Sequence, residues 1–262
     1  MLPSSTTVLP NAPAQVAAGW RPLNLEQGMI PVRGWVRYGD GSISGKTLLP
    51  IYIEGDGDAW KRRWQPSADP TPKKAQAFQL AAADHSSSVV YLGRPCQYLS
   101  EVELKDCNPS WWTGQRFSPK IIETYEQLID QVKGAAGATQ IRLIGYSGGG
   151  VLATLLAQQR SDVEQLMTVA APLALSMWSE WHRVSPLMGS LDPLQRGGNH
   201  EVISSAMHWA GAEDRIVPPA IINRFVYRQG GVVKQIEGFD HQCCWTEIWP
   251  QSLKEMGQGG GK

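Results

Sequence analysis

The chain has 262 residues, a length that accommodates one α/β domain with a large core. It is 42% hydrophobic and 18% charged, which excludes global disorder. Lys plus Arg and Asp plus Glu are both 24, so the formal net charge is +0 and no long-range attraction draws a polyanion to the chain. This balance disfavours nucleic acid as a partner.

The two ends of the chain differ from its middle. Residues 1–28 are rich in Pro, Ala and Ser and are expected to form an extended tether, and residues 257–262 a flexible tail. The start lacks the basic and apolar regions of a signal peptide, and no apolar run is long enough to span a bilayer. A mature exported chain, or one that has lost a lipid anchor, would look the same.

Between them, over residues 29–256, apolar segments rich in β-branched residues alternate with helical ones. A helix is expected over 118–137, with Ser118 as N-cap and Pro119 at its first position, and another over 148–159. Strands are expected over 29–38, 47–55 (joined to the first by the turn "GDGSISG"), 86–93, 139–147, 163–172, 201–214 and 231–240.

Strands that alternate with helices predict a mostly parallel central sheet flanked by helices on both faces. The segment 173–200 interrupts this alternation, since it is aromatic at first and rich in Pro and Gly later. It is expected to be an insertion that forms a cap over a site.

The stretch "GYSGG", residues 145–149, matches G-x-S-x-G and lies between an expected strand and an expected helix. The sharp turn that joins them has no room for large neighbours. It would expose the Ser147 hydroxyl above the sheet edge and aim the amide of Gly148 and the helix N-terminus at an oxyanion. A glycine-rich turn with an incidental serine is the alternative interpretation.

This motif in its strand-to-helix setting resembles the α/β-hydrolase superfamily, over about residues 30–250. The resemblance implies an α/β-hydrolase fold and the chain order Ser, acid, His. "HWAGAEDRIVPP" resembles the acid loop and nominates Asp214, with Glu213 or Asp240 as alternatives. "EGFDHQCCW" resembles the histidine loop and nominates His241, the histidine that follows the final strand; the competitors are His85, His182, His200 and His208.

More narrowly, "YIEGDGDAW", "LGRPCQY", "WWTGQRFSP" and "VSPLMGSLDP" resemble a group of uncharacterised bacterial α/β-hydrolases that are often predicted to be exported or lipid-anchored. This resemblance implies a periplasmic or exported protein, with a cytoplasmic one as the alternative. The spacing of Cys96 and Cys107 predicts a disulfide, in keeping with an oxidising compartment. The pairing of Cys243 and Cys244 is left open.

Superfamily members often carry His-Gly-x in the loop after the third strand, where this chain has Glu54-Gly55-Asp56. By position, the amide of Asp56 is the expected second oxyanion donor, with Gly57 as the alternative. A carboxylate beside an oxyanion would oppose it, so the acids of this loop, Asp58 included, are expected to turn away or pair with a cation. The candidate cations are Arg94, Lys61 and Arg62.

Three acids close together also suggest a calcium loop, but "AWKRRW" follows where the calcium pattern needs a Glu. No metal site and no cofactor are therefore expected. Aromatic residues beside these motifs are candidates for the walls of a small-molecule pocket: Trp60, Tyr146, Trp178 and Trp181.

A serine made nucleophilic by a histidine base, which an aspartate orients, predicts acyl transfer through an acyl-enzyme. The leading hypothesis is a serine hydrolase that cleaves carboxylic esters of small to medium acyl groups, because "LALSMWSEW" is too polar for a long lipase lid. A peptidase, amidase or thioesterase would use the same residues. A hydrolase-like binding protein without catalysis is the third hypothesis.

Overall fold

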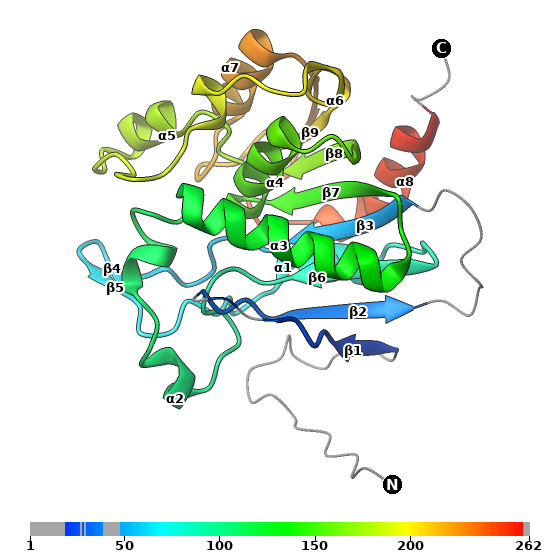
Figure 1. Ribbon diagram of the computed structural model, residues 1–262. Coiled ribbons are helices and arrows are strands. Elements are labelled where there is room, and N and C mark those ends of the chain that lie inside the picture. The colour runs from blue at the N-terminus through cyan, green and yellow to red at the C-terminus, as the bar shows by residue number, and fades with distance from the viewer. Residues whose placement is uncertain (1–18, 27, 29, 39–47, 259–262) are drawn as a thin grey trace, which may run out of the picture.

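The computed structural model describes residues 19–26, 28, 30–38 and 48–258, and within them an eight-stranded sheet forms the centre of the molecule (Figure 1). The strand order is β1-β2-β6-β3-β7-β8-β9-β10. The β1–β2 and β2–β6 pairs are antiparallel and the others are parallel, as predicted for the sheet as a whole. The strands are β1 (Trp20–Pro22), β2 (Gly34–Tyr38), β3 (Leu48–Ile53), β6 (Ser88–Leu92), β7 (Gln140–Tyr146), β8 (Val163–Val169), β9 (Met207–Gly211) and β10 (Val232–Ile236).

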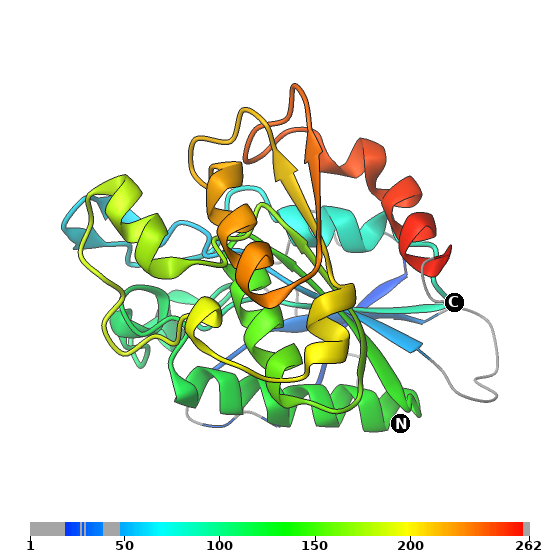
Figure 2. The same cartoon turned by 90° about the horizontal axis from the view of Figure 1, so that it is seen from above.

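Helices cover both faces of this sheet, and Figure 2 separates the two layers. One apolar core packs α3, α4, α6 and α7 on one face, and a second core packs α1 and α8 on the other. A separate two-stranded ribbon of β4 (Trp60–Arg62) and β5 (Gln65–Pro66) lies at the same end of the molecule as α5. The α-helices are α1 (Gln76–Ala82), α2 (Glu101–Leu104), α3 (Pro119–Ala136), α4 (Gly148–Gln159), α5 (Leu175–His182), α6 (His200–Ser205), α7 (Pro219–Gln229) and α8 (Trp245–Gln258).

The ends of α3 and the start of α4 agree with the predictions made from neighbouring residues in the sequence. Helix α3 has Ser118 as its N-cap residue and Pro119 as its first residue, although the Ser118 side chain makes no capping hydrogen bond. The helix ends at Ala136 and is followed by the C-cap residue Gly137, which adopts a left-handed conformation with φ 61°. Helix α4 begins at Gly148, directly after the serine of the G-x-S-x-G motif.

Three expectations about the sheet were wrong in part. The first two expected strands are not neighbours, because β6 lies between β2 and β3; the expected turn over 39–45 lies outside the described residues. The segment 201–214 is not one strand, since α6 occupies its first part and β9 begins only at Met207. Residues 20–22, expected in the tether, form the edge strand β1.

Strand β3 carries a proline, Pro50, inside a central part of the sheet. A proline has no amide hydrogen to donate and is normally confined to sheet edges. Here Pro50 is paired with Arg142 of β7, while pairing with β6 begins only at Ile51. The proline therefore lies where β3 has a neighbour on one side only, and the strand still delivers its carboxyl end to the site.

Candidate active site

Ser147 stands on a strained turn between β7 and α4. Its backbone has φ 50° and ψ −122°, a region that a residue with a side chain rarely adopts. The neighbouring glycines allow the turn to close. A Cβ on Gly145 would lie 2.3 Å from the carbonyl oxygen of Gly149, and one on Gly149 would lie 2.1 Å from that of Ile53. The backbone thus enforces the residue types of the motif.

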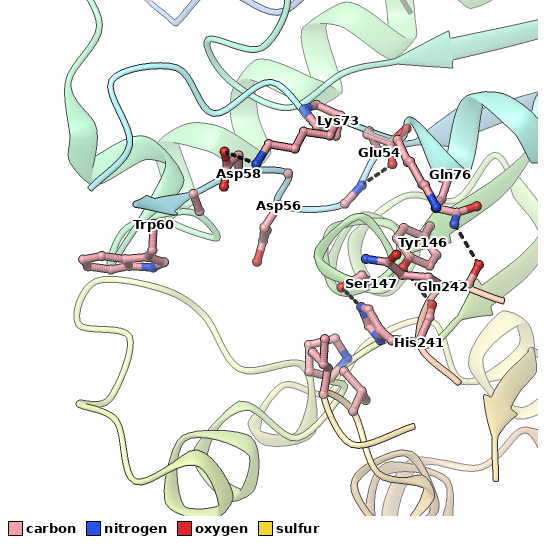
Figure 3. A pocket seen from close by; sticks show the side chains of 18 of the residues that line it. Glu54, Asp56, Asp58, Trp60, Lys73, Gln76, Tyr146, Ser147, His241 and Gln242 are labelled. Atoms are coloured by element: carbon pink, nitrogen blue, oxygen red, sulfur yellow. Dashed lines mark hydrogen bonds and ion pairs between the residues drawn. The ribbon is translucent and has the colours of Figure 1, made fainter. Parts of the chain in front are cut away.

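The structure brings Ser147, His241 and Asp214 into one chain of hydrogen bonds (Figure 3). His241 Nε2 lies 3.1 Å from Ser147 Oγ, and His241 Nδ1 lies 2.8 Å from Asp214 Oδ2. A carboxylate only accepts, so Nδ1 carries the proton and Nε2 is free to accept one from the hydroxyl. The amides of Ile216 and Val217 donate to Asp214 Oδ1 and fix the orientation of the buried carboxylate.

The alternatives to Asp214 lie elsewhere. Asp240 is exposed and its Oδ1 accepts hydrogen bonds from the amides of Gln242 and Cys243, which hold its pKa below the ordinary value. Glu213 is exposed. Of the four competing histidines, His85 and His200 are exposed, His182 lies 2.7 Å from the carbonyl oxygen of Ile216, and His208 is buried beside Thr168.

Tyr146 holds the loop that carries His241 in place. Its hydroxyl donates to the carbonyl oxygen of His241 over 2.8 Å, and the indole of Trp245 donates to the same oxygen. The Tyr146 and His241 rings lie 5.3 Å apart, and burial raises the pKa of the phenol well above its ordinary value. Tyr146 also lines the cavity described below, so it both faces that cavity and positions His241.

Glu54, which stands where superfamily members often have histidine, is buried and turned away from Ser147. Its carboxylate accepts from the amides of Gly55, Ala77 and Phe78 and from the hydroxyl of Tyr91. Two of these amides belong to the first turn of α1, so Glu54 caps a helix that is distant in sequence. Burial raises the pKa of Glu54, and the four hydrogen bonds oppose that rise.

Asp56 is neutralised by two buried arginines. Its Oδ1 lies 2.9 Å from Arg94 Nη1, and its Oδ2 lies 3.2 Å from Arg116 Nε. The same carboxylate covers the start of α4, because a Cβ on Gly148 would lie 2.1 Å from Asp56 Oδ1. Burial lowers the pKa of Arg116; Asp56 opposes this effect, and Arg94 adds to it.

Gln97 sets the direction of the Gly55–Asp56 peptide. Its buried side-chain amide donates to the carbonyl oxygen of Gly55 over 3.0 Å. In a trans peptide the N–H points opposite to the C=O, so the Asp56 amide is directed away from Gln97. Within the described part of the chain, neither this amide nor that of Gly148 has a protein acceptor, whereas Gly57 is held in a left-handed conformation against the Pro70 carbonyl oxygen.

The third acid of the loop, Asp58, pairs loosely with Lys73 over 3.7 Å. Of the three candidate cations, only Arg94 contacts an acid of this loop. Lys61 and Arg62 are exposed on β4, and their nomination was wrong. The acids of the loop are thus either paired or directed away from Ser147, as expected; Arg94 was an expected partner, and Arg116 and Lys73 were not.

A cavity of about 590 Å³ opens beside Ser147 and His241. Figure 3 shows Asp56 between Trp60 on one side and Ser147 on the other. Trp178 of α5 lines the cavity too, and its indole donates to the carbonyl oxygen of Ile216. Trp181 does not line it and is exposed on α5, so the structure separates this fourth aromatic candidate from the site.

Both cysteine pairs form disulfides, Cys96–Cys107 as predicted and Cys243–Cys244 directly after the histidine loop. Among the described residues, no group of three or more His, Cys, Asp or Glu side chains is placed to hold a metal ion. No helix in that part of the chain is long and apolar enough to cross a bilayer.

Sequence reasoning missed three residues of the site: Arg116, Gln97 and Lys73. Gln97 belongs to "GRPCQY", where the sequence suggests a role for Arg94 alone among the polar residues, and Arg116 belongs to "GQRFSP", where it suggests none. A buried polar residue among aromatic and apolar neighbours signals a partner. No local pattern, however, tells which loop that partner comes from.

Comparison with known proteins establishes the fold. No protein-family model matches the chain, and no curated protein sequence matches it. Solved structures do. An α/β serine hydrolase homologue from Coxiella burnetii has a TM-score of 0.59 at 14% identity, with 92% of this chain and 97% of that chain covered. Est1E from Butyrivibrio proteoclasticus has a TM-score of 0.60 at 15% identity, with 94% of this chain and 100% of that chain covered.

A puromycin-hydrolysing peptidase from Mycobacterium tuberculosis has a TM-score of 0.64 at 13% identity. It matches over 92% of this chain but only 39% of its own, so this chain is similar to one part of a larger enzyme. Together with the sheet order and the strained serine turn, these likenesses show that the chain has the α/β-hydrolase fold.

Proposed function

We propose that the protein is a serine hydrolase that cleaves carboxylic esters through an acyl-enzyme intermediate. The observation that carries the proposal is the hydrogen-bonded chain from Ser147 through His241 to Asp214, with the serine raised on a strained turn above the cavity. A scaffold that only binds a partner has no need of this geometry. The structural likeness to serine hydrolases supports the proposal without fixing the bond that is cut.

In the proposed reaction, His241 Nε2 removes the proton of Ser147 as the hydroxyl oxygen attacks the ester carbonyl. Asp214 stabilises the imidazolium that forms and keeps its Nδ1 proton in place. His241 then gives the proton to the departing alcohol, which leaves an acyl group on Ser147. Water activated by the same imidazole hydrolyses this acyl-enzyme.

The negative charge that develops on the carbonyl oxygen needs donors. We assign the amides of Gly148 and Asp56 to this role, because both lack a protein acceptor within the described residues and Gln97 sets the direction of the second. Gly57 is the weaker candidate, since its backbone is packed against Pro70. The pairing of the Asp56 side chain with two arginines keeps its charge from opposing the oxyanion.

Small to medium acyl groups fit this site best. The cavity has a volume of about 590 Å³, and charged and polar residues (Asp58, Lys73, Lys74 and Gln76) contribute to its lining beside Trp60 and Trp178. An amide-cleaving activity is the second candidate, because peptidases also have this fold and the same tetrahedral intermediate serves both reactions.

Labelling with a fluorophosphonate probe tests the proposal directly. Wild type is expected to be labelled, whereas Ser147→Ala and His241→Ala are expected to lose the label while remaining folded by circular dichroism. A series of p-nitrophenyl esters, with matched anilides, then gives the chain-length optimum and the preference for ester over amide. A folded wild type that reacts with neither probe nor ester would overturn the proposal.

We also propose that the protein works in an oxidising compartment, outside the cytoplasm. Both cysteine pairs are joined in disulfides, and such pairs persist where no thiol system reduces them. Thiol-alkylation mass shifts on protein taken from intact cells, fractionated into cytoplasm and periplasm, test this assignment. Recovery of the reduced protein in the cytoplasmic fraction would contradict it.

A further inference from the structure

Arg116 is a buried cation beside Ser147 whose hydrogen-bond donors the described part of the protein leaves unused, whereas the other cations of the cavity lining, Lys73 and Lys74, are exposed. Arg116 is 5% exposed and lines this cavity, while its Nε lies 3.2 Å from Asp56 Oδ2. Among the described residues, no group accepts a hydrogen bond from the Arg116 side chain, and its buried Nε makes only the ion pair with Asp56. A buried guanidinium with unused donors in the wall of a cavity is costly unless a ligand completes its hydrogen bonds.

The buried charges around Arg116 have an excess of one positive charge. Asp56 is shared with Arg94, which also donates to the Arg116 carbonyl oxygen over 2.6 Å and is thereby used within the protein. The other acids that line the cavity are engaged as well, Glu54 with amides and a phenol and Asp58 with Lys73. Two buried arginines therefore face one carboxylate.

Aromatic rings hold the Arg116 side chain in place. The guanidinium carbon lies 5.5 Å from the ring centre of Trp178 and 5.6 Å from that of Phe117. Cation–π contacts and the Asp56 pair restrict the side chain before any ligand arrives, so little entropy is lost on binding. A planar fork held in this manner matches a carboxylate through two parallel hydrogen bonds.

We propose that Arg116 is the residue that selects substrates bearing a free carboxylate. The enzyme then prefers half-esters of dicarboxylic acids, or hydroxy acids acylated on their hydroxyl group, over the same esters with the carboxylate methylated. This inference rests on the proposed function, since it names the substrate class of the same site. The scissile ester lies over Ser147, and the free carboxylate of the substrate pairs with the terminal nitrogens of Arg116. The residual charge of the Asp56–Arg94–Arg116 group, +1, suits a monoanion.

The test compares pairs of esters that differ only in whether the free carboxylate is methylated. Mono-p-nitrophenyl adipate and its methyl ester place the carboxylate on the acyl side, and 4-acetoxybenzoate and its methyl ester place it on the alcohol side. Wild type is expected to favour the anionic member of at least one pair by about 10-fold or more in kcat/KM, mainly through KM. Equal cleavage of both members of both pairs by wild type overturns the inference, whatever any variant does.

The preference is expressed as the ratio of kcat/KM for the anionic ester to kcat/KM for the neutral ester. Arg116 also supports Asp56, so its replacement can slow the cleavage of both esters, and the ratio cancels any such common effect. Arg116→Gln is expected to reduce the preference to about 1 to 2, and Arg116→Lys to give an intermediate value. Arg62→Gln removes the same charge from an exposed site on β4 outside the cavity lining and is expected to retain the preference. Retention in Arg116→Gln, or an equal loss in Arg62→Gln, would refute the assignment.

A binding experiment separates this inference from the proposed function. Ser147→Ala is titrated with monomethyl adipate and with dimethyl adipate by calorimetry, which needs no turnover. One outcome is that wild type cleaves no ester, that Ser147→Ala binds monomethyl adipate more tightly than dimethyl adipate, and that adding Arg116→Gln abolishes this difference in affinity. In that case the anion site stands and the hydrolase proposal fails. If esters are cleaved but the two adipates bind alike, the hydrolase stands and the anion site fails.

Discussion

His208 makes the stability of this protein sensitive to mild acid. The side chain is fully buried, its Nδ1 lies 2.8 Å from the hydroxyl of Thr168, and its Nε2 has no partner among the described residues. Burial lowers the pKa of His208 to about 3. The unfolded chain therefore takes up a proton near the ordinary pKa of about 6.5, while the folded chain keeps the imidazole neutral.

The sign follows from this difference. The folded-state pKa is the lower one, so the contribution of His208 to stability is complete above about pH 6.5 and is lost as the pH falls toward 3. With these two pKa values, the free energy of unfolding is about 2 kcal/mol smaller at pH 5 than at pH 7 because of this residue alone. A loss of that size is a large part of the stability of an ordinary domain.

The assay is urea unfolding at a series of pH values between about 5 and 7.5, for wild type and for His208→Gln. Glutamine does not titrate and its side-chain amide can still form a hydrogen bond with Thr168, so the variant is expected to lose most of the pH slope even if its stability at pH 7 has changed. Carboxylates titrate in both proteins and cancel in the comparison. A variant with the same slope as wild type would refute the reasoning.

Three further outcomes are expected. Ser147→Ala reduces kcat for the best aryl ester by about 10⁴-fold or more, measured in a continuous p-nitrophenol assay, because the attacking oxygen is gone. Gly148→Ala reduces kcat by about 10-fold or more in the same assay, because the added Cβ would lie 2.1 Å from Asp56 Oδ1 and must displace the carboxylate above the proposed oxyanion donors. Cys96→Ser opens the loop that ends at Cys107, whose separation is 11 residues, and reduces the free energy of unfolding by about 3 kcal/mol in urea.

Matched controls sharpen two of these. Gly134→Ala in α3 adds a Cβ that meets nothing within 4 Å, so its kcat should equal that of wild type. If Gly148→Ala is equally active, the close approach of Asp56 is unimportant for turnover. For the disulfide, the control is the addition of reductant to Cys96→Ser, which can break only Cys243–Cys244. The unfolding midpoint is expected to fall by much less than it fell on substitution of Cys96. A further fall of similar size would assign the stabilisation to Cys243–Cys244 instead.

The serine turn could be predicted from the sequence because its geometry is local. Gly145 and Gly149 face backbone atoms of the same turn and of β3 at distances that leave no space for a Cβ, so the residue spacing encodes the turn. The start of α3 is local in the same sense, since Ser118 and Pro119 match the dihedral requirements of the first helical residues. In both cases a few neighbouring residues determine the backbone.

The sheet order and the partners of the acids could not be predicted, because long-range pairing decides them. Nothing in the segments that form β2 and β3 indicates that β6 is inserted between them, and β1 is too short to show a period. Likewise, Arg116 reaches Asp56 from a loop 60 residues further along the chain, whereas the nearby Arg62 remains exposed. The sequence therefore offered Arg94 and Arg62 as equal candidates and gave no ground for choosing between them.

In the proposed hydrolase, Asp56 links substrate specificity to turnover. Its amide is the second donor that we assign to the oxyanion, and its carboxylate is the counter-ion of the cation that we propose selects the substrate. Replacing Arg116 to admit a neutral substrate would therefore also leave the oxyanion loop with an altered charge balance. Substrate preference is expected to evolve here by coupled substitutions of Asp56, Arg94 and Arg116, with strong epistasis among them.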